Sequence, residues 1–74
     1  MKTRRERFEE VAAKRVQRIL DYLDLLANCS NKKNYEYSDE DVRKMLKAIK
    51  EKIRFVESSF YQEVNKDNSN IFRF

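Results

Sequence analysis

The 74-residue chain contains neither Gly nor Pro. These two residue types are the usual breakers of a helix, because Pro removes a backbone hydrogen-bond donor and Gly costs conformational entropy. Lys, Glu, Arg and Leu, which favour helices, are frequent, and charged residues make up 41% of the chain. We therefore expect an all-α fold.

The first half of the chain has the pattern of one long helix. From Phe8 to Ala27 the apolar residues recur at helical spacings of three and four. Thr3 followed by Glu6 fits a capping box, in which each residue satisfies a free backbone donor near the helix start. These signals predict a helix over about residues 4–28.

The second half carries a more regular pattern. Between residues 42 and 60 the apolar positions alternate at spacings of four and three. Ser38 is a favourable N-cap, and Asp41 stands at the capping-box position three residues later. The pattern predicts a second helix over about residues 39–64.

The segment between these helices, residues 28–37, contains three Asn and a Ser, which supply turn chemistry because Asn makes Asx turns and tolerates a left-handed backbone. Tyr37 and Val42 occupy the two positions of a hydrophobic staple. We expect a helical hairpin domain over residues 1–64, followed by a flexible polar tail over 65–74 that ends in an aromatic tip.

Two long helices joined by a short loop predict an antiparallel two-helix hairpin. A chain of this size has little core of its own, and the first apolar stripe is wide enough for a second neighbour. We therefore expect a homodimer that forms a four-helix bundle. The residues expected in the core or at the self-association surface are Val16, Ile19, Leu23, Leu26, Val42, Leu46, Ile49, Ile53, Val56 and Phe60.

Several functional classes lack the residues they need. With no His and a single Cys, Cys29, the chain has no thiolate–imidazole set for zinc, no internal disulfide and no Cys–His catalytic pair. Without Gly it has no phosphate-cradling loop. We expect no cofactor, no metal site, no small-molecule substrate and no enzymatic activity. The sequence has neither an apolar signal segment nor an 18-residue apolar run, so we expect a cytoplasmic protein without a membrane span.

The second helix also carries a row of cations. Arg43, Lys47, Lys50 and Arg54 follow spacings of four, three and four and share one face, which we expect roughly opposite the apolar stripe. One interpretation is a footprint for nucleic-acid phosphates, which binds without sequence preference. The other is an ordinary solvated face, and pairing of Glu51 with Lys47 would weaken the patch.

Both ends of the chain offer further candidate contacts. Arg4, Arg5 and Arg7 oppose the dipole of the first helix, so they form either a nucleic-acid-binding arm or solubilising charge. Phe72 and Phe74 either dock in a groove of a partner protein or cover apolar surface of the hairpin.

Three segments carry a resemblance to a known group: residues 14–21 (KRVQRILD), 25–31 (LLANCSN) and 34–42 (NYEYSDEDV). Over about residues 5–57 the chain resembles small uncharacterised helical proteins carried by plasmids and integrative mobile elements of Gram-positive bacteria. The resemblance implies an accessory role on a mobile element, and it implies no catalytic motif and no site residues.

Two functional hypotheses follow. The first is a non-enzymatic, self-associating helical module that docks on an unidentified partner protein. Its docking surface is a helix face, the aromatic tail or the acidic end near the loop, which consists of Asp21, Asp24, Asp39, Glu40 and Asp41. The alternative is an accessory protein that binds nucleic acid without sequence preference through the basic face of the second helix and the N-terminal arginines.

Overall fold

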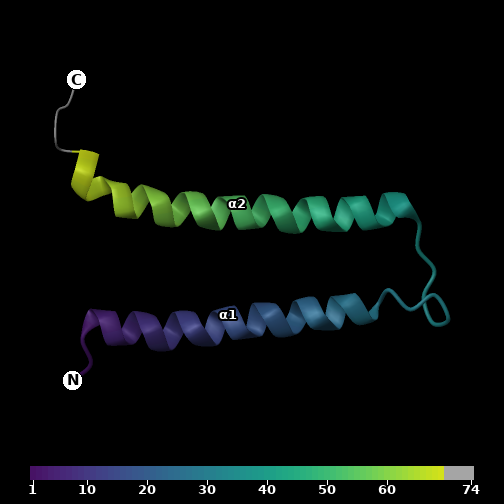
Figure 1. The fold of residues 1–74 in the computed structure, drawn as a ribbon, viewed down its shortest axis with the longest axis horizontal. Helices are drawn as coiled ribbons and strands as arrows, with labels where there is room; N and C mark the ends of the chain where they lie inside the picture. The colour runs from purple at the N-terminus through teal and green to yellow at the C-terminus, as the bar shows by residue number, and fades with distance from the viewer. Residues whose placement is uncertain (70–74) are drawn as a thin grey trace. The chain divides into compact units, whose positions relative to one another are not determined.

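The computed structural model describes residues 1–69, with side chains over residues 1–66, and this part of the chain is all-α (Figure 1). Helix α1 spans Arg4–Asn28 and helix α2 spans Asp39–Ser69. At a rise of 1.5 Å per residue, the two helices are about 37 and 46 Å long. The all-α class and the two-helix fold predicted from the sequence are confirmed.

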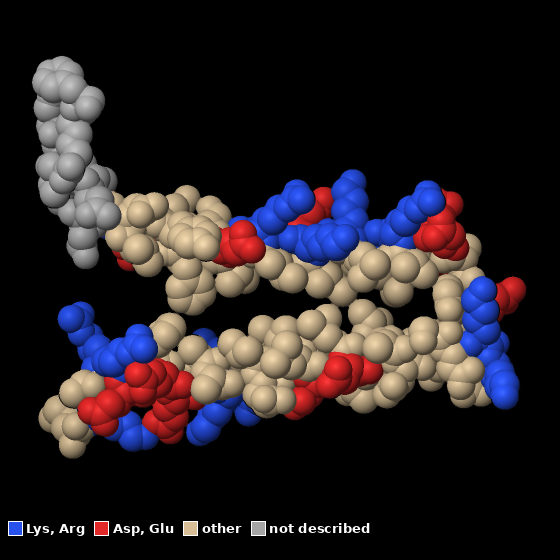
Figure 2. Space-filling view, viewed as in Figure 1, with Lys and Arg blue, Asp and Glu red and all other residues tan. Residues whose placement is uncertain are grey.

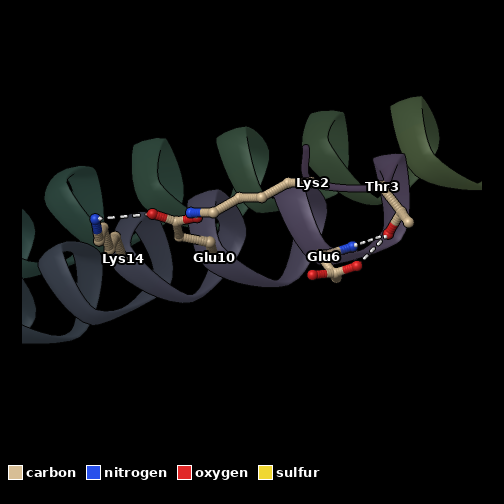
Figure 3. Close-up of polar contacts among 5 residues, drawn as sticks. All are labelled: Lys2, Thr3, Glu6, Glu10 and Lys14. Carbon is tan, nitrogen blue, oxygen red and sulfur yellow. Dashed lines mark hydrogen bonds and ion pairs between the residues drawn. The ribbon is translucent and has the colours of Figure 1, made fainter.

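Helix α1 begins at the residue that the capping pattern predicts. Thr3 has an extended backbone with φ of −72° and ψ of 165°, and its Oγ1 accepts a hydrogen bond from the backbone N–H of Glu6 at 3.1 Å. The Glu6 carboxylate does not reach back to a backbone donor; it accepts the Thr3 hydroxyl at 3.0 Å (Figure 3). The two side chains therefore hydrogen-bond to each other. Separately, Thr3 Oγ1 satisfies one free backbone N–H of the first turn.

The end of α1 is closed by tighter, 3₁₀-type hydrogen bonds. The N–H of Cys29 donates to the carbonyl of Leu26 at 2.9 Å, and the N–H of Ser30 donates to that of Ala27 at 3.1 Å. Cys29 keeps a right-handed backbone, with φ of −72° and ψ of −5°. These bonds satisfy carbonyl groups that the last turn of a helix leaves free.

Asn31 organises the connecting segment. Its side-chain oxygen accepts the N–H of Lys33 at 3.0 Å, which is an Asx turn, and its carbonyl accepts the N–H groups of Asn34 and Tyr35. The turn chemistry expected of Asn is thus present. The left-handed backbone that Asn tolerates is not used, because no non-Gly residue of the described chain has a positive φ.

Helix α2 begins with a reciprocal capping box. The N–H of Ser38 donates to Asp41 Oδ2 at 2.8 Å, and the N–H of Asp41 donates to Ser38 Oγ at 3.2 Å. The backbone N–H of Ser38 and then its hydroxyl hold the pKa of the Asp41 carboxyl below its ordinary value of 3.8. Tyr37 and Val42 are both half-buried, as a hydrophobic staple requires.

Helix α2 is longer than predicted. The expected end near residue 64 is wrong, because the helix continues to Ser69 through part of the segment predicted to be a flexible tail. No Gly or Pro interrupts the chain there. In addition, Lys66 pairs with Glu63 at 3.0 Å, one turn earlier, and places a cation near the negative end of the helix dipole.

None of the residues whose burial is described is fully buried. The apolar residues that come nearest to burial are half-buried: Val11, Ala12, Leu26, Val42 and Ile49. The stability of each helix therefore depends on its caps and on contacts between side chains one turn apart.

The capping box of α2 is expected to stabilise the helical state. We expect Ser38→Ala to destabilise the helical state by about 1 kcal/mol, because it removes the side-chain acceptor of the N-cap. Thermal melts followed by circular dichroism measure this loss. Ser58→Ala is the matched control: Ser58 lies inside α2, where Ala is the better helix former, so its melt should not fall. Equal melts for the two variants would contradict a capping role for Ser38.

The lowered pKa of Asp41 is expected to make the stability of the helical state depend on pH. Because its carboxyl titrates below 3.8 in the helical state, the ionised form stabilises that state above pH 3.8, and this contribution is lost as the pH falls through the lowered pKa. An acid titration of helicity by circular dichroism should therefore show a steeper loss in the original chain than in Asp41→Asn. Identical curves would contradict this contribution.

Candidate functional site

The strongest candidate site is a row of cations on α2, which we call the basic row: Arg43, Lys47, Lys50 and Arg54. These residues lie in the regular part of the helix, so its 3.6-residue period places them on one side. Figure 2 shows Lys and Arg side chains gathered along one side of α2. The sequence prediction that these residues share a face is consistent with this placement.

The basic row flanks the apolar stripe of α2 and does not lie opposite to it. At 100° per residue, the centre of the row is about 110° from the centre of the stripe over residues 42–60. The stripe residue Leu46 lines the same shallow groove, of about 300 Å³, as the four cations and Glu51. The expectation of roughly opposite faces is therefore wrong, and the row borders apolar surface along one edge.

Two cations at the start of α2 are tied to carboxylates one turn earlier. Arg43 Nη2 lies 2.6 Å from Asp39 Oδ2, and Lys44 Nζ lies 3.6 Å from Glu40 Oε1. These ion pairs are exposed and worth little in free energy. They do neutralise the charge that Arg43 brings to the row.

The other three cations of the basic row differ from Arg43 in their pairing. Lys47, Lys50 and Arg54 make no ion pair with any residue of the described chain. The pair between Glu51 and Lys47 that was expected to weaken the patch is not formed. Residues 43–54 hold six basic and one acidic side chain, so the middle of α2 has more cations than nearby carboxylates.

The N-terminal arginines are part of α1, which begins at the predicted residue. Arg4, Arg5 and Arg7 all lie within the first turns of the helix. Arg5 pairs with Glu9 at 2.9 Å and lies over the ring of Phe8 at 5.7 Å from its centre. Arg4 and Arg7 make no ion pair within residues 1–66.

Lys2, which precedes the helix, is held against it. Its Nζ binds Glu10 Oε2, and Lys14 Nζ lies 3.5 Å from the other oxygen of the same carboxylate (Figure 3). The hydrogen bond from Lys2, and then the charge of Lys14, hold the pKa of the Glu10 carboxyl below its ordinary value of 4.5. The cations at this end of α1 are thus partly engaged with carboxylates of their own helix.

Most of the residues predicted for the core or for self-association are exposed. Leu26, Val42 and Ile49 are half-buried. The others expose between 38% and 59% of their surface: Val16, Ile19, Leu23, Leu46, Ile53, Val56 and Phe60. Each helix thus carries an apolar stripe of partly exposed side chains.

Three further cations were not among the contacts predicted from the sequence. Arg15 and Arg18 on α1 make no ion pair in the described part of the chain, and Lys52 lies over the ring of Phe55 at 5.4 Å from its centre. The signal for the two arginines was present in the sequence, since residues 14, 15 and 18 are basic.

The remaining candidate features are Cys29, clusters of metal-binding side chains, membrane spans and the two C-terminal phenylalanines. Cys29 is exposed, and its thiol donates to the carbonyl of Leu25 at 3.8 Å. Over the described residues, no group of three or more His, Cys, Asp or Glu side chains is placed to hold a metal ion. Neither helix, as far as it is described, is long and apolar enough to cross a membrane. Phe72 and Phe74, predicted to dock on a partner, lie outside the described residues.

No family model, curated protein or solved structure matches the chain. The resemblance to mobile-element proteins therefore stays a prediction.

The contact between Lys2 and Glu10 makes a prediction about titration. We expect Lys2→Gln to raise the pKa of the Glu10 carboxyl toward 4.5, because the hydrogen bond from Lys2 is the largest cause of its lowered value. Carboxyl chemical shifts followed by NMR over an acid titration measure this change. The control Lys44→Gln removes a cation of α2 that pairs with Glu40 and should leave Glu10 unchanged. An unaltered Glu10 titration in Lys2→Gln would show that the contact does not persist in solution.

Proposed function

We propose that the protein is a small, non-enzymatic helical interaction module that associates with itself and docks on a partner protein. The observation that supports this proposal is the exposure of the apolar stripes, which leaves Ile19 at 59% and Phe60 at 54% of their surface. Apolar surface of this kind is stabilised by a covering partner, because removing it from water is the main favourable term in association.

Covering the stripes contributes a favourable free energy to association. Complete burial of a Val, Leu, Ile or Phe side chain contributes about 1.5–3 kcal/mol, so covering the exposed half of each contributes roughly 1 kcal/mol. The exposed stripe residues of α2 alone, Leu46, Ile53, Val56 and Phe60, then offer several kcal/mol before the cost of association.

The shape of the α2 stripe supports a helix as the covering partner. Its spacings of four and three over residues 42–60 are the pattern of helices that pack along each other, and Met45 and Ala48 widen the stripe. A second copy of the chain supplies such a helix by symmetry, and a homodimer in the form of a four-helix bundle is the simplest assembly.

The composition supports a binding role without catalysis. The chain has no His to act as a general base near neutral pH and only one Cys. Together with the resemblance to mobile-element proteins, this supports an accessory role in the cytoplasm, in which the module acts by holding other macromolecules together.

Sedimentation equilibrium of the full chain tests self-association. We expect a mass at least twice the 9.1 kDa of one chain. Ile53→Glu places a charge in the centre of the α2 stripe. This variant should raise the dissociation constant at least about tenfold, because burial of such a side chain is worth about 1.5–3 kcal/mol.

The matched control is Ser58→Glu, which adds the same charge on the side of α2 away from the stripe. It should leave the mass unchanged, and circular dichroism should show both variants to be helical. A mass of one chain for the original protein across the accessible concentrations, or equal weakening by the two variants, would overturn the proposal.

A further inference from the structure

We propose that the basic row of α2 binds the phosphate backbone of nucleic acid without sequence preference. This activity goes beyond the proposed self-association and does not depend on it. The surface that carries it consists of Lys47, Lys50 and Arg54, with Arg43 at its edge.

Three cations of the basic row lack a local ion pair. On a charged helix that is merely solvated, cations are balanced by carboxylates one turn away, and the start of α2 has this arrangement in the Arg43–Asp39 and Lys44–Glu40 pairs. In the middle of the same helix such ion pairs are not formed, although Glu51 stands one turn after Lys47. Lys47, Lys50 and Arg54 pair with no described carboxylate, so their counterions come from solution and can be released when a polyanion binds.

The length of the basic row matches several phosphates of one strand. The basic row extends over residues 43–54, which is about 16 Å along the helix axis. One strand of duplex DNA presents a phosphate about every 3.4 Å along its axis, so the row spans roughly five phosphates. Three cations at successive turns can therefore contact separate phosphates of a single strand.

The groove along the basic row lacks the amide and aromatic side chains that contact bases. Its lining consists of the four cations, Leu46 and Glu51, and it contains no Asn, Gln or aromatic side chain. Amide side chains are common readers of adenine, and aromatic ones provide stacking surfaces for unpaired bases. Cations alone position a protein on the backbone and carry little sequence information, so binding should be independent of sequence.

The basic row stays accessible when a helix covers the apolar stripe. A helix packed on the stripe over residues 42–60 faces its centre, whereas the basic row lies about 110° away. An anionic membrane is a poorer partner, because a bilayer would have to take up the stripe itself, whose spacings of four and three match a packed helix.

A salt titration of binding tests this proposal. The full chain is mixed with a fluorescent random-sequence DNA duplex of about 20 base pairs, and anisotropy is measured from about 20 to 200 mM NaCl. Three phosphate contacts predict a slope of log K against log salt of about −2.7. In the triple variant Lys47→Gln, Lys50→Gln, Arg54→Gln, the slope should approach zero, with little binding remaining at the upper salt concentration.

The matched control is the triple variant Arg5→Gln, Lys14→Gln, Lys44→Gln. It removes three cations that are ion-paired, and it lowers the formal net charge from +4 to +1, as the first variant does. The control should keep most of the affinity and the slope of the original chain. Replacing Lys47 and Lys50 with Arg should also preserve binding, because the charge is retained.

Three results would overturn the proposal. Equal weakening by the two triple variants would show that overall charge, and not the basic row, attracts the duplex. Absence of duplex binding at the lowest salt concentration would show that no such site exists. Binding to phosphatidylserine vesicles that depends on the row, without binding to duplex DNA, would assign the surface to a membrane. Because self-association is measured separately with Ile53→Glu, failure of one proposal is distinguishable from failure of the other.

Discussion

The burial of apolar side chains is the constraint on which this molecule depends. Its helices carry their apolar residues as stripes, and no residue with described burial is fully removed from water. The hydrogen bonds of the helices are satisfied within each helix and contribute little net free energy, and isolated helices of ordinary length are marginal in water. The largest stabilising term still open to the chain is therefore the covering of these stripes, which is why we infer that self-association is central to its role.

The starts of both helices could be predicted from the sequence because each is determined by a few neighbouring residues. Thr3 with Glu6, and Ser38 with Asp41, form hydrogen bonds within one turn, so no distant contact has to be known. The end of α2 has no such signal. Because Gly and Pro are absent, no local residue marks the end of this helix. The change to a polar composition near residue 65 predicted an end there, whereas the helix continues to Ser69. Polar composition by itself does not end a helix whose residues tolerate it.

The basic row could be predicted only in part. Its membership follows from spacing, because residues three and four apart must share a helix face. Its state of pairing depends on the rotamers of long exposed side chains, so the sequence did not reveal that Arg43 pairs with Asp39 while Lys47 stays apart from Glu51. The position of the row beside the stripe needed only the angular arithmetic of the helix, and inspection of spacing alone missed it. The arginines at the start of α1 stayed open between two roles, a nucleic-acid-binding arm and solubilising charge, because spacing alone does not reveal that Arg5 pairs with Glu9 while Arg4 and Arg7 form no ion pair with a described residue.

The stripe and the basic row together give one helix two surfaces that do not compete, and this separation has a consequence for binding. A self-associated form would carry the row once per copy, so a nucleic acid long enough to reach two rows would engage the second at a high effective concentration. Association through the stripe would then strengthen phosphate binding without any new contact. By linkage, nucleic acid would favour the associated form to the same extent, since a coupling free energy is reciprocal. The weak charge of a single chain, +4 in total, would thus matter less than the number of rows that an assembly brings to one strand.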